Sequence, residues 1–174
     1  ANRVMMAIAV ALGGTVPDAV TLAQTVSASY PYRLILADGD YNYYGLTQNG
    51  DDIYTAKFNS DNTLAWDVHI DGSDATFGPN LNGSGFAVDD SGNVYISSND
   101  LVWNNTLGQY EPNPVLIKLD NTGTEVWTKR FADGFGRMHF DGTNLIAAQS
   151  GALASLDPAD GTYNWKRNIT GNVA

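Results

Sequence analysis

The chain has 174 residues, enough for one ordinary domain or for part of a larger one. It is 43% hydrophobic, 11% aromatic and 16% charged, with 18 glycines, which is a globular composition rich in turns. Nineteen acidic against nine basic residues give a formal net charge of -10, and a surface with that balance repels phosphate, so nucleic acid is excluded as a partner. The absence of cysteine excludes disulfides, thiolate chemistry and cysteine-ligated zinc.

Residues 1–30 are interpreted as an N-terminal arm with an anchoring role. They are rich in Ala, Val and Thr and lack Trp and Phe, and a short helix is predicted from about Pro17 to Val26. The apolar run from Val4 to Leu12 is too short to cross a bilayer as a helix. It is either a packed segment of the arm or a remnant of a secretory signal, and the packed segment is the preferred interpretation.

From Tyr30 onward, short apolar or alternating runs are separated by clusters of Asp, Asn and Gly. This pattern is typical of an all-β chain made of hairpins, and no helical periodicity follows residue 30. Twelve strands are predicted: 32–37, 41–46, 52–58, 64–70, 85–89, 93–97, 115–119, 125–130, 137–140, 144–148, 152–156 and 163–168.

The strands fall into an internal repeat of two hairpin elements. The first element is a strand, an Asp and Gly turn, and a second strand: "ILADGDYNYYG", "FAVDDSGNVYIS" and "HFDGTNLIAA". The second is a strand, an Asp or Asn turn, and a tryptophan: "KFNSDNTLAW", "KLDNTGTEVW" and "SLDPADGTYNW". Each first element is followed by its second, three times over, so each unit carries four short strands.

The turn residues and the tryptophans of this repeat have a structural explanation. Asp and Asn bond their own backbone in a turn and Gly accepts a positive φ, so these turns close tight hairpins. The tryptophan lies on the returning strand, where its ring can cover the neighbouring sheet. The positions assigned to this structural role are Gly39, Gly92, Gly142, Gly161, Asp120, Asp157, Trp66, Trp127 and Trp165.

These units resemble the bacterial seven-bladed β-propeller repeat of the SBBP type, which reads roughly Gly-Asn-Val-Tyr-Val, a loop, and then Lys-x-Asp-x-x-Gly-x-x-x-Trp. The stretches "DDSGNVYISS" and "VLIKLDNTGTEVWTKRF" carry the likeness. The last unit resembles the tryptophan-docking repeat of the pyrroloquinoline-quinone propellers. Asp157, Gly161 and Trp165 fall on its marked positions, while Asp160 stands where that pattern has Thr.

The resemblance implies an all-β fold of three four-stranded propeller-like blades, over residues 32–70, 84–131 and 136–170. Closed propellers have four to eight blades, so three blades make a partial propeller, or one that further chain or other subunits complete. Quinoprotein dehydrogenases use calcium and, in many members, a vicinal cysteine pair, which this chain lacks. Propellers serve as enzymes, scaffolds and adhesins alike, so the resemblance does not fix a function.

No residue is assigned a catalytic or metal-binding role. Asp38, Asp40 and Asn42 alternate as calcium ligands would, but no glutamate follows at the twelve-residue spacing, and turn chemistry is the preferred interpretation. His69 and His139 are the two histidines, in no zinc motif. Paired carboxylates for glycoside cleavage stay open as an alternative, although no pair stands out. No cofactor is therefore expected, with calcium as the alternative.

The segment Asn99 to Pro114, "NDLVWNNTLGQYEPNP", is predicted to be a long inserted loop. Trp103 and Tyr110 stand in it among Asn and Gln, a mixture suited to stacking on sugar rings or to filling a pocket of a protein partner. The alternative is that these aromatic side chains fold back on their own blade. Trp103 and Tyr110 are the candidate binding residues.

The function expected from the sequence is non-catalytic: a structural or adhesive component of an extracellular assembly, such as a phage virion or tail fibre, or a bacterial surface protein. Low charge, abundant Asn, Gly, Ser and Thr and a nearly uncharged arm suit such a part. Its expected partners are protein subunits, further copies of itself and a glycan, with no membrane span. The alternatives are a fragment of a propeller enzyme, quinone-dependent or glycan-acting, and a periplasmic assembly scaffold.

Overall fold

The computed structural model describes residues 32, 34–49, 52–71 and 85–169. The predicted arm, with its helix over residues 17–26, lies outside these residues. Within them the chain forms twelve strands and no helix, so none of this part offers a helix that could span a membrane.

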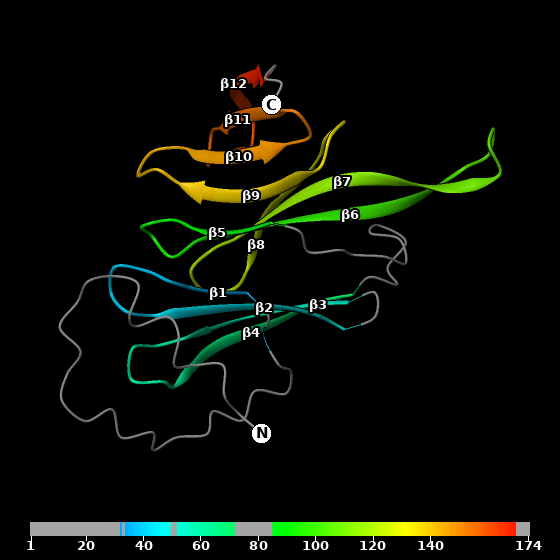
Figure 1. The fold of residues 1–174 in the computed structure, drawn as a ribbon. Helices are drawn as coiled ribbons and strands as arrows, with labels where there is room; N and C mark the ends of the chain where they lie inside the picture. Colours follow the sequence, from blue (N-terminus) through cyan, green and yellow to red (C-terminus); the bar gives the residue numbers. More distant parts are fainter. Residues whose placement is uncertain (1–31, 33, 50–51, 72–84, 170–174) are drawn as a thin grey trace, which may run out of the picture.

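The strands form three antiparallel sheets of four, each arranged in chain order (Figure 1). This confirms the predicted all-β fold of three four-stranded blades. Blade 1 comprises β1 (Leu34–Ala37), β2 (Tyr43–Asn49), β3 (Asp52–Phe58) and β4 (Leu64–Ile70). Blade 2 comprises β5 (Gly85–Val88), β6 (Val94–Asn104), β7 (Gln109–Leu119) and β8 (Glu125–Arg130). Blade 3 comprises β9 (Phe135–Phe140), β10 (Leu145–Gln149), β11 (Ala152–Leu156) and β12 (Tyr163–Asn168).

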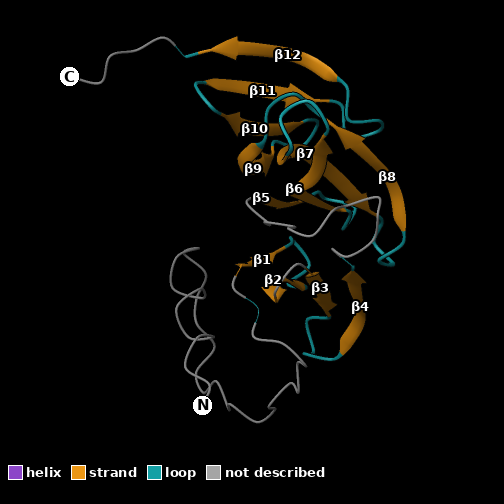
Figure 2. Cartoon of the chain, turned by 90° about the vertical axis from the view of Figure 1, so that its right-hand side faces the viewer, coloured by secondary structure: helices purple, strands orange, loops and turns teal. Residues whose placement is uncertain are grey.

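The blades are stacked in an arc, with the first strand of each on the inside. Strands β1, β5 and β9 are neighbours, while β4, β8 and β12 lie along the outer rim (Figure 2). Every sheet hydrogen bond lies within a blade, because the pairing joins consecutive strands. The blades are therefore held together through their faces. We call the face toward the next blade along the chain the trailing face, and the opposite one the leading face.

Asp turns and bulges set the register of each blade. The carboxylate of Asp120 accepts hydrogen bonds from the N–H groups of Thr122 and Thr124, and closes the turn between β7 and β8. A register shift lies beside this turn, at Lys118 and Leu119, and the corresponding shift recurs in the other two blades. The tryptophans consequently occupy the same place in all three sheets.

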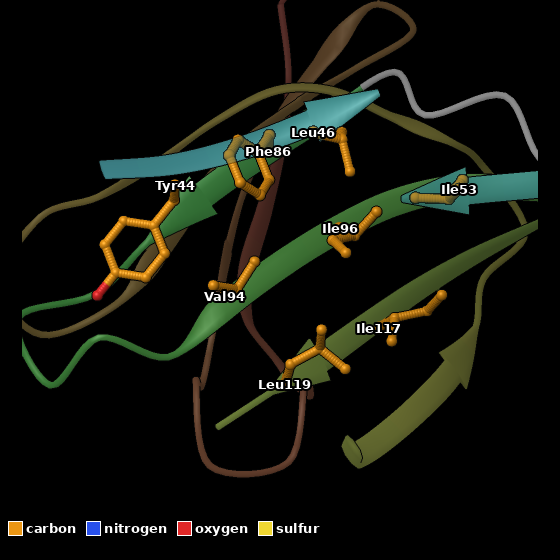
Figure 3. Close-up of a cluster of buried hydrophobic side chains, with 8 residues drawn as sticks. All are labelled: Tyr44, Leu46, Ile53, Phe86, Val94, Ile96, Ile117 and Leu119. Atoms are coloured by element: carbon orange, nitrogen blue, oxygen red, sulfur yellow. The ribbon is translucent and has the colours of Figure 1, made fainter. Parts of the chain in front are cut away.

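The first hydrophobic core lies between blades 1 and 2 (Figure 3). Tyr44 and Leu46 of β2 extend from the trailing face of blade 1, and Ile96 of β6 meets them from the leading face of blade 2. All three are at most 2% exposed. The remaining buried members of this core are Ile53, Phe86, Val94, Ile117 and Leu119.

A second core lies between blades 2 and 3. Tyr95 and Leu116 of blade 2 pack with Leu145 and Leu156 of blade 3, and all four are at most 1% exposed. Aromatic rings flank it at the connection between the blades, where Phe131 meets Phe135 edge to face at 4.7 Å between ring centroids. Burying these side chains is the main favourable term that joins the two sheets.

The prediction of a loop over residues 99–114 is wrong. These residues extend β6 and β7 into a two-stranded hairpin that projects beyond the blade (Figure 1). Pairing runs without interruption from Asn99 opposite Pro114 to Asn104 opposite Gln109. The Asn, Gly and Pro residues that indicated a loop are tolerated here because neither β5 nor β8 pairs with this part of the hairpin.

The repeat suggested that Gly39, Gly92 and Gly142 are equivalent positions of the first turn, but in the structure they are not. Gly92 and Gly142 have φ values of 78° and 94°, whereas the left-handed residue of the first blade's turn is Tyr41, with φ of 61°. Tyr41 follows Asp38 by three residues, as Gly92 follows Asp89. The left-handed conformation of that turn is therefore adopted by the exposed Tyr41 and not by Gly39, and the backbone strain lies at Tyr41.

One glycine is required by the close approach of blades 2 and 3. A Cβ on Gly85 would collide with the carbonyl oxygen of Gly136, whereas a Cβ on Gly39 would meet no atom within 4 Å. We expect Gly85→Ala to push β5 and β9 apart and to lower the free energy of unfolding by about 1–3 kcal/mol. Gly39→Ala, the matched control, should change it by less than ~0.5 kcal/mol. Urea unfolding measures both, and equal effects would contradict the contact.

Candidate functional site

The contact between blades 1 and 2 is built around Trp66 of β4. Its indole Nε1 donates to the carbonyl oxygen of Asn121, at 2.9 Å, in the outer turn of blade 2. Its ring lies over Gly123 of the same turn, where a Cβ would be 3.0 Å from Cδ2 of the ring. Gly123 has φ of 84°, so both its conformation and its missing side chain serve this contact. The tryptophan of one blade therefore binds the outer turn of the next.

Blades 2 and 3 repeat the arrangement with one difference. Trp127 of β8 lies over Gly161, where a Cβ would be 2.9 Å from Cη2 of the ring. The Nζ of Lys118 donates to the carbonyl oxygen of Pro158 at 2.8 Å. The buried Nε1 of Trp127 has no hydrogen-bond partner among the described residues. Lys118 therefore donates to the carbonyl oxygen that corresponds to the one bound by the Trp66 indole in the first contact.

A tyrosine and a lysine support each of these two tryptophans. Tyr44, Lys57 and Trp66 are directly paired across β2, β3 and β4, and the lysine Nζ lies 5.4 Å from the centre of the Tyr44 ring. Tyr95, Lys118 and Trp127 repeat the row in blade 2, with the same 5.4 Å distance. Sequence reasoning missed this row. The signal was visible, since Lys57 and Lys118 each stand nine residues before their tryptophan.

The two tyrosines are anchored by the aspartates of the inner turns. Tyr44 donates to Asp38 at 2.9 Å and Tyr95 donates to Asp89 at 2.8 Å. Burial, and then the hydrogen bond to the carboxylate, raises the pKa of both phenols well above the ordinary value. Both side chains are therefore neutral donors at any physiological pH.

Blade 3 presents the third row on its trailing face, which packs against no other described blade, although Ser155 within the row is only 1% exposed. Ile146, Ser155 and Trp165 are paired across β10, β11 and β12, so Ile and Ser replace the tyrosine and the lysine. Trp165 is 37% exposed, and its ring is contacted by the guanidinium of Arg167 at 5.1 Å. The buried Oγ of Ser155 has no hydrogen-bond partner among the described residues. Leu153, opposite Arg167, extends this surface and is 38% exposed.

We call this surface the open face; it is the trailing face of blade 3. It consists of Ile146, Ala148, Leu153, Ser155, Trp165 and Arg167. It has the composition of a docking surface, with an aromatic anchor, aliphatic side chains and one cation. The described residues supply no outer turn for Trp165 as they do for Trp66 and Trp127.

A hollow of about 240 Å³ lies where the inner strands of the three blades end. Two of its three acidic residues, Asp38 and Asp89, are committed to the turns. The carboxylate of Asp38 accepts hydrogen bonds from Asp40 N–H, from Asn42 and from Tyr44, and Asp89 has the corresponding set. The hollow is lined by Leu36, Ala37, Asp38, Gly39, Ala87, Val88, Asp89, Asp90, Met138, His139 and Phe140.

The calcium alternative places its ligands in the first of these turns. Asp38 binds the side chain of Asn42 there, so two of the three suggested ligands satisfy each other. No group of three His, Asp or Glu residues in the described ranges is arranged to hold a metal ion. His69 stacks on Tyr54 at 4.6 Å between ring centroids and lies 3.1 Å from a carboxylate oxygen of Asp52, on the surface of blade 1.

The two aromatic residues suggested for binding belong to the projecting hairpin. Trp103 and Tyr110 are directly opposite each other near its end. Only their backbones are described, and a role in binding sugar or protein remains a prediction. At the tip, Asn104 donates to Glu111 at 2.9 Å and Leu107 is 59% exposed.

Comparison with known proteins identifies the architecture. No protein-family model and no curated protein matches the sequence. BamB from Moraxella catarrhalis is similar with a TM-score of 0.53 and 16% identity over 81% of this chain, which spans 36% of the length of BamB. The WD40 domain of Pan2 from Neurospora crassa gives a TM-score of 0.46 and 12% identity, covering 80% of this chain and 50% of that one. The chain has a partial β-propeller fold.

The acidic outer turns give a pH-dependent stability. The Thr122 hydroxyl, and then the N–H groups of Thr124 and Thr122, hold the pKa of Asp120 below 3.8. A depressed pKa means that the carboxylate stabilises the fold above pH 3.8, and that this contribution is lost as the pH falls through the folded-state pKa. We expect Thr122→Ala to raise the Asp120 pKa in an NMR titration. The stability difference from wild type should then shrink in acid.

The control for this titration is Thr143→Ala. The carboxylate of Asp141 accepts from the backbone N–H groups of Thr143 and Asn144, which the substitution keeps. Its pKa is lowered by those backbone bonds and should stay where it is. A Thr122→Ala protein with an unchanged Asp120 titration would show that the hydroxyl bond is unimportant.

The outer-turn glycine should be irreplaceable only where a tryptophan covers it. Gly161→Asn would place a Cβ against Trp127, and we expect it to lower the free energy of unfolding by about 1–3 kcal/mol. Asn62, the corresponding residue of blade 1, is exposed with φ of 67°. Asn62→Gly should change stability by less than ~1 kcal/mol, since Asn tolerates this conformation. Similar losses in both variants, measured by urea unfolding, would argue against the tryptophan contact.

Proposed function

We propose that the protein is a non-catalytic structural component of an extracellular assembly, and that it binds another protein subunit through the open face. The observation that carries this proposal is Trp165. It occupies the position from which Trp66 and Trp127 each bind the outer turn of a neighbouring blade, and it remains 37% exposed. Trp165 lies on the edge strand β12, beside the aliphatic side chains of the open face, and a partly exposed indole in such a setting is a typical anchor of protein interfaces.

The chemistry of the remaining surface supports a binding role over catalysis. In the hollow at the inner strand ends, the carboxylates of Asp38 and Asp89 accept hydrogen bonds from turn N–H groups and from buried tyrosines. Burial raises the pKa of Asp38, but the hydrogen bonds from Asn42, Tyr44 and Asp40 N–H lower it below the ordinary value, so this carboxylate is a poor general base. We therefore assign the repeated geometry of the turns to holding the blades in place.

The setting we propose is a phage virion, including a tail fibre, or a bacterial surface structure. Support comes from the sequence: low charge density, abundant Asn, Gly, Ser and Thr, and no cysteine. The repeat is proposed to be of the SBBP type, with the quinone-propeller docking pattern in its last unit. Adhesion through the projecting hairpin, to a glycan or a protein, belongs to the same proposal.

Replacing Trp165 should separate assembly from folding. Because Trp165 is partly exposed, we expect Trp165→Ala to lower the free energy of unfolding by less than ~1 kcal/mol. Trp127→Ala opens a cavity between two blades and should cost about 3–5 kcal/mol. Only the first variant should fold normally and yet fail to enter the native assembly, as measured by sedimentation of the assembled particles.

A photo-crosslinking residue at Leu153 tests the contact directly in the native assembly. We expect a covalent adduct with another subunit from position 153, which is lost in Trp165→Ala. Ser60, an exposed residue in the outer turn of blade 1, is the matched control position. An assembly that forms without an adduct at position 153, or with equal adducts at both positions, would overturn the proposed function.

A further inference from the structure

The projecting hairpin of blade 2 has an edge that the three blades do not use. β6 and β7 have 11 residues each, against 7 in β2 and β3 and 5 in β10 and β11, so neither of the other blades is extended in this way (Figure 1). β5 pairs with β6 only as far as Ser97, which lies opposite Gly85. From Asn99 to Asn104, β6 is therefore an edge strand among the strands that the structure describes.

The backbone of β6 presents both donors and acceptors at this edge. Asp89 N–H donates to the carbonyl oxygen of Asn93 at 3.0 Å, so the backbone groups of Asn93 point toward β5. Backbone groups alternate in direction along a strand, and the register of β6 runs without a shift, so Asn99, Leu101 and Trp103 point to the same side. No described strand pairs with them there, which leaves a template for an added strand.

The opposite edge of the hairpin is closed by proline. Phe131 N–H donates to the carbonyl oxygen of Pro114 at 2.8 Å, so Pro114 points away from β6. By the same alternation, Tyr110 and Pro112 also point away from β6. Two of these three residues have no N–H, which makes the β7 edge a poor template for another strand. The hairpin is thus protected on one edge and open on the other.

The two faces of the hairpin also differ. The Oγ of Ser97 donates to a backbone carbonyl of blade 3 at 2.7 Å, so Ser97 lies on the trailing face. Alternation places Leu101 and Trp103 on that face as well, directly opposite Pro112 and Tyr110. The leading face carries Asp100, Val102, Asn104, Gln109, Glu111 and Asn113. A strand that continues this sheet must therefore be apolar on one side and polar on the other.

The leading face of blade 1 is a less suitable place for self-association. Tyr32, which precedes β1, lies on Gly45 of this face, where a Cβ would be 2.6 Å from Cγ of the tyrosine ring. The same ring meets Phe58 edge to face at 5.9 Å between centroids. A second copy docking there would have to displace Tyr32, whereas a strand added to β6 displaces no described residue.

We propose that β6 pairs with β6 of a second copy of this chain, antiparallel and about a two-fold axis through Leu101. The axis is perpendicular to the sheet, so the apolar faces of both hairpins lie on the same side. Leu101 lies opposite its counterpart and Asn99 lies opposite Trp103 of the second copy, so every outward-pointing residue exchanges hydrogen bonds. The product is a four-stranded sheet whose two outer strands are the proline-containing β7 strands. The edge of β6 is thus complementary to itself in backbone and in pattern.

The proposed register and the charge of the chain set the strength of this contact. Asp100 lies opposite Val102 of the second copy, and not opposite another carboxylate. Each chain has a formal net charge of -10, so the copies repel each other at long range, and salt screens that repulsion. The contact continues the pairing of β5 with β6 but is far smaller than a standard interface of about 1,600 Å². We therefore expect a weak dimer that salt strengthens.

Disulfide cross-linking tests the register. Because the chain has no cysteine, Asp100→Cys and Val102→Cys each provide a single thiol. Opposed residues that are not hydrogen-bonded have Cα atoms about 4.5 Å apart in antiparallel strands, which suits a disulfide. A mixture of the two variants should give the mixed disulfide, while either variant alone, the matched control, should give at least about fivefold less dimer. Equal yields would overturn pairing about Leu101.

Replacing Leu101 by proline tests the backbone contact. The N–H of Leu101 points away from β7, so its loss breaks no bond of the hairpin. In sedimentation equilibrium over a concentration series, we expect Leu101→Pro to weaken the wild-type dimer by about thirtyfold or more, since each copy loses one hydrogen bond. Leu101→Ala, the matched control, keeps the N–H and should weaken it by no more than about fivefold. A wild-type monomer at every concentration, or a dimer that Leu101→Pro leaves unchanged, would overturn the proposal.

Hydrogen exchange separates this contact from the alternatives. The amides of Asn99, Leu101 and Trp103 should exchange slowly in the dimer and rapidly in the dilute monomer. Slow exchange in the monomer would show that the chain itself covers the edge, and would reject the second copy. Trp165→Ala should leave the dimer unchanged, because the open face is a different surface. Failure of the β6 pairing therefore leaves the proposed function intact, and failure of docking at Trp165 leaves the β6 pairing intact.

Discussion

The structure depends on one steric constraint, the contact of a tryptophan ring with a turn that has no Cβ. Among the described strands, no hydrogen-bond ladder joins one sheet to the next, so the blades are held together by the contact between their faces. At Gly123 and Gly161 a side chain would take the space of Trp66 or Trp127. The apolar cores beneath are buried because these outer contacts close the interface, and the Tyr and Lys of each row fill the space between them.

The same constraint gives the arc a direction. Each blade offers a tryptophan on one face and a bare turn on the other, so blades join head to tail as in a heterologous assembly. The first blade departs from this rule at Tyr32 and Asn62, while the third keeps its tryptophan and changes the residues beside it. An end that is filled by its own chain and an end that presents an indole have different fates in an assembly, although the three sheets are alike.

Local chemistry explains how much of the fold was predictable. Each Asp turn signals its hairpin within a few residues, and the tryptophan marks the returning strand, so the strands and their grouping follow from the sequence. The hairpin beyond Asn99 was missed because its Asn, Gly and Pro residues resemble a loop when strand partners are unknown. Tyr41 in a left-handed turn, Tyr32 on Gly45 and the lysine rows were missed because each depends on residues distant in the chain or on a backbone angle that has no letter code.

The projecting hairpin extends well beyond blade 2, so its tip offers a second point of contact far from the blades. Six residue pairs, Asn99–Pro114 to Asn104–Gln109, extend past β5 and β8, which at about 3.3 Å per residue gives a reach of about 20 Å. A body held at one patch can pivot about it. If the tip of the hairpin touches a neighbour as well, the lever arm converts even a weak second contact into a strong resistance to rotation. The hairpin would then fix the orientation of the propeller blades more than it strengthens their attachment.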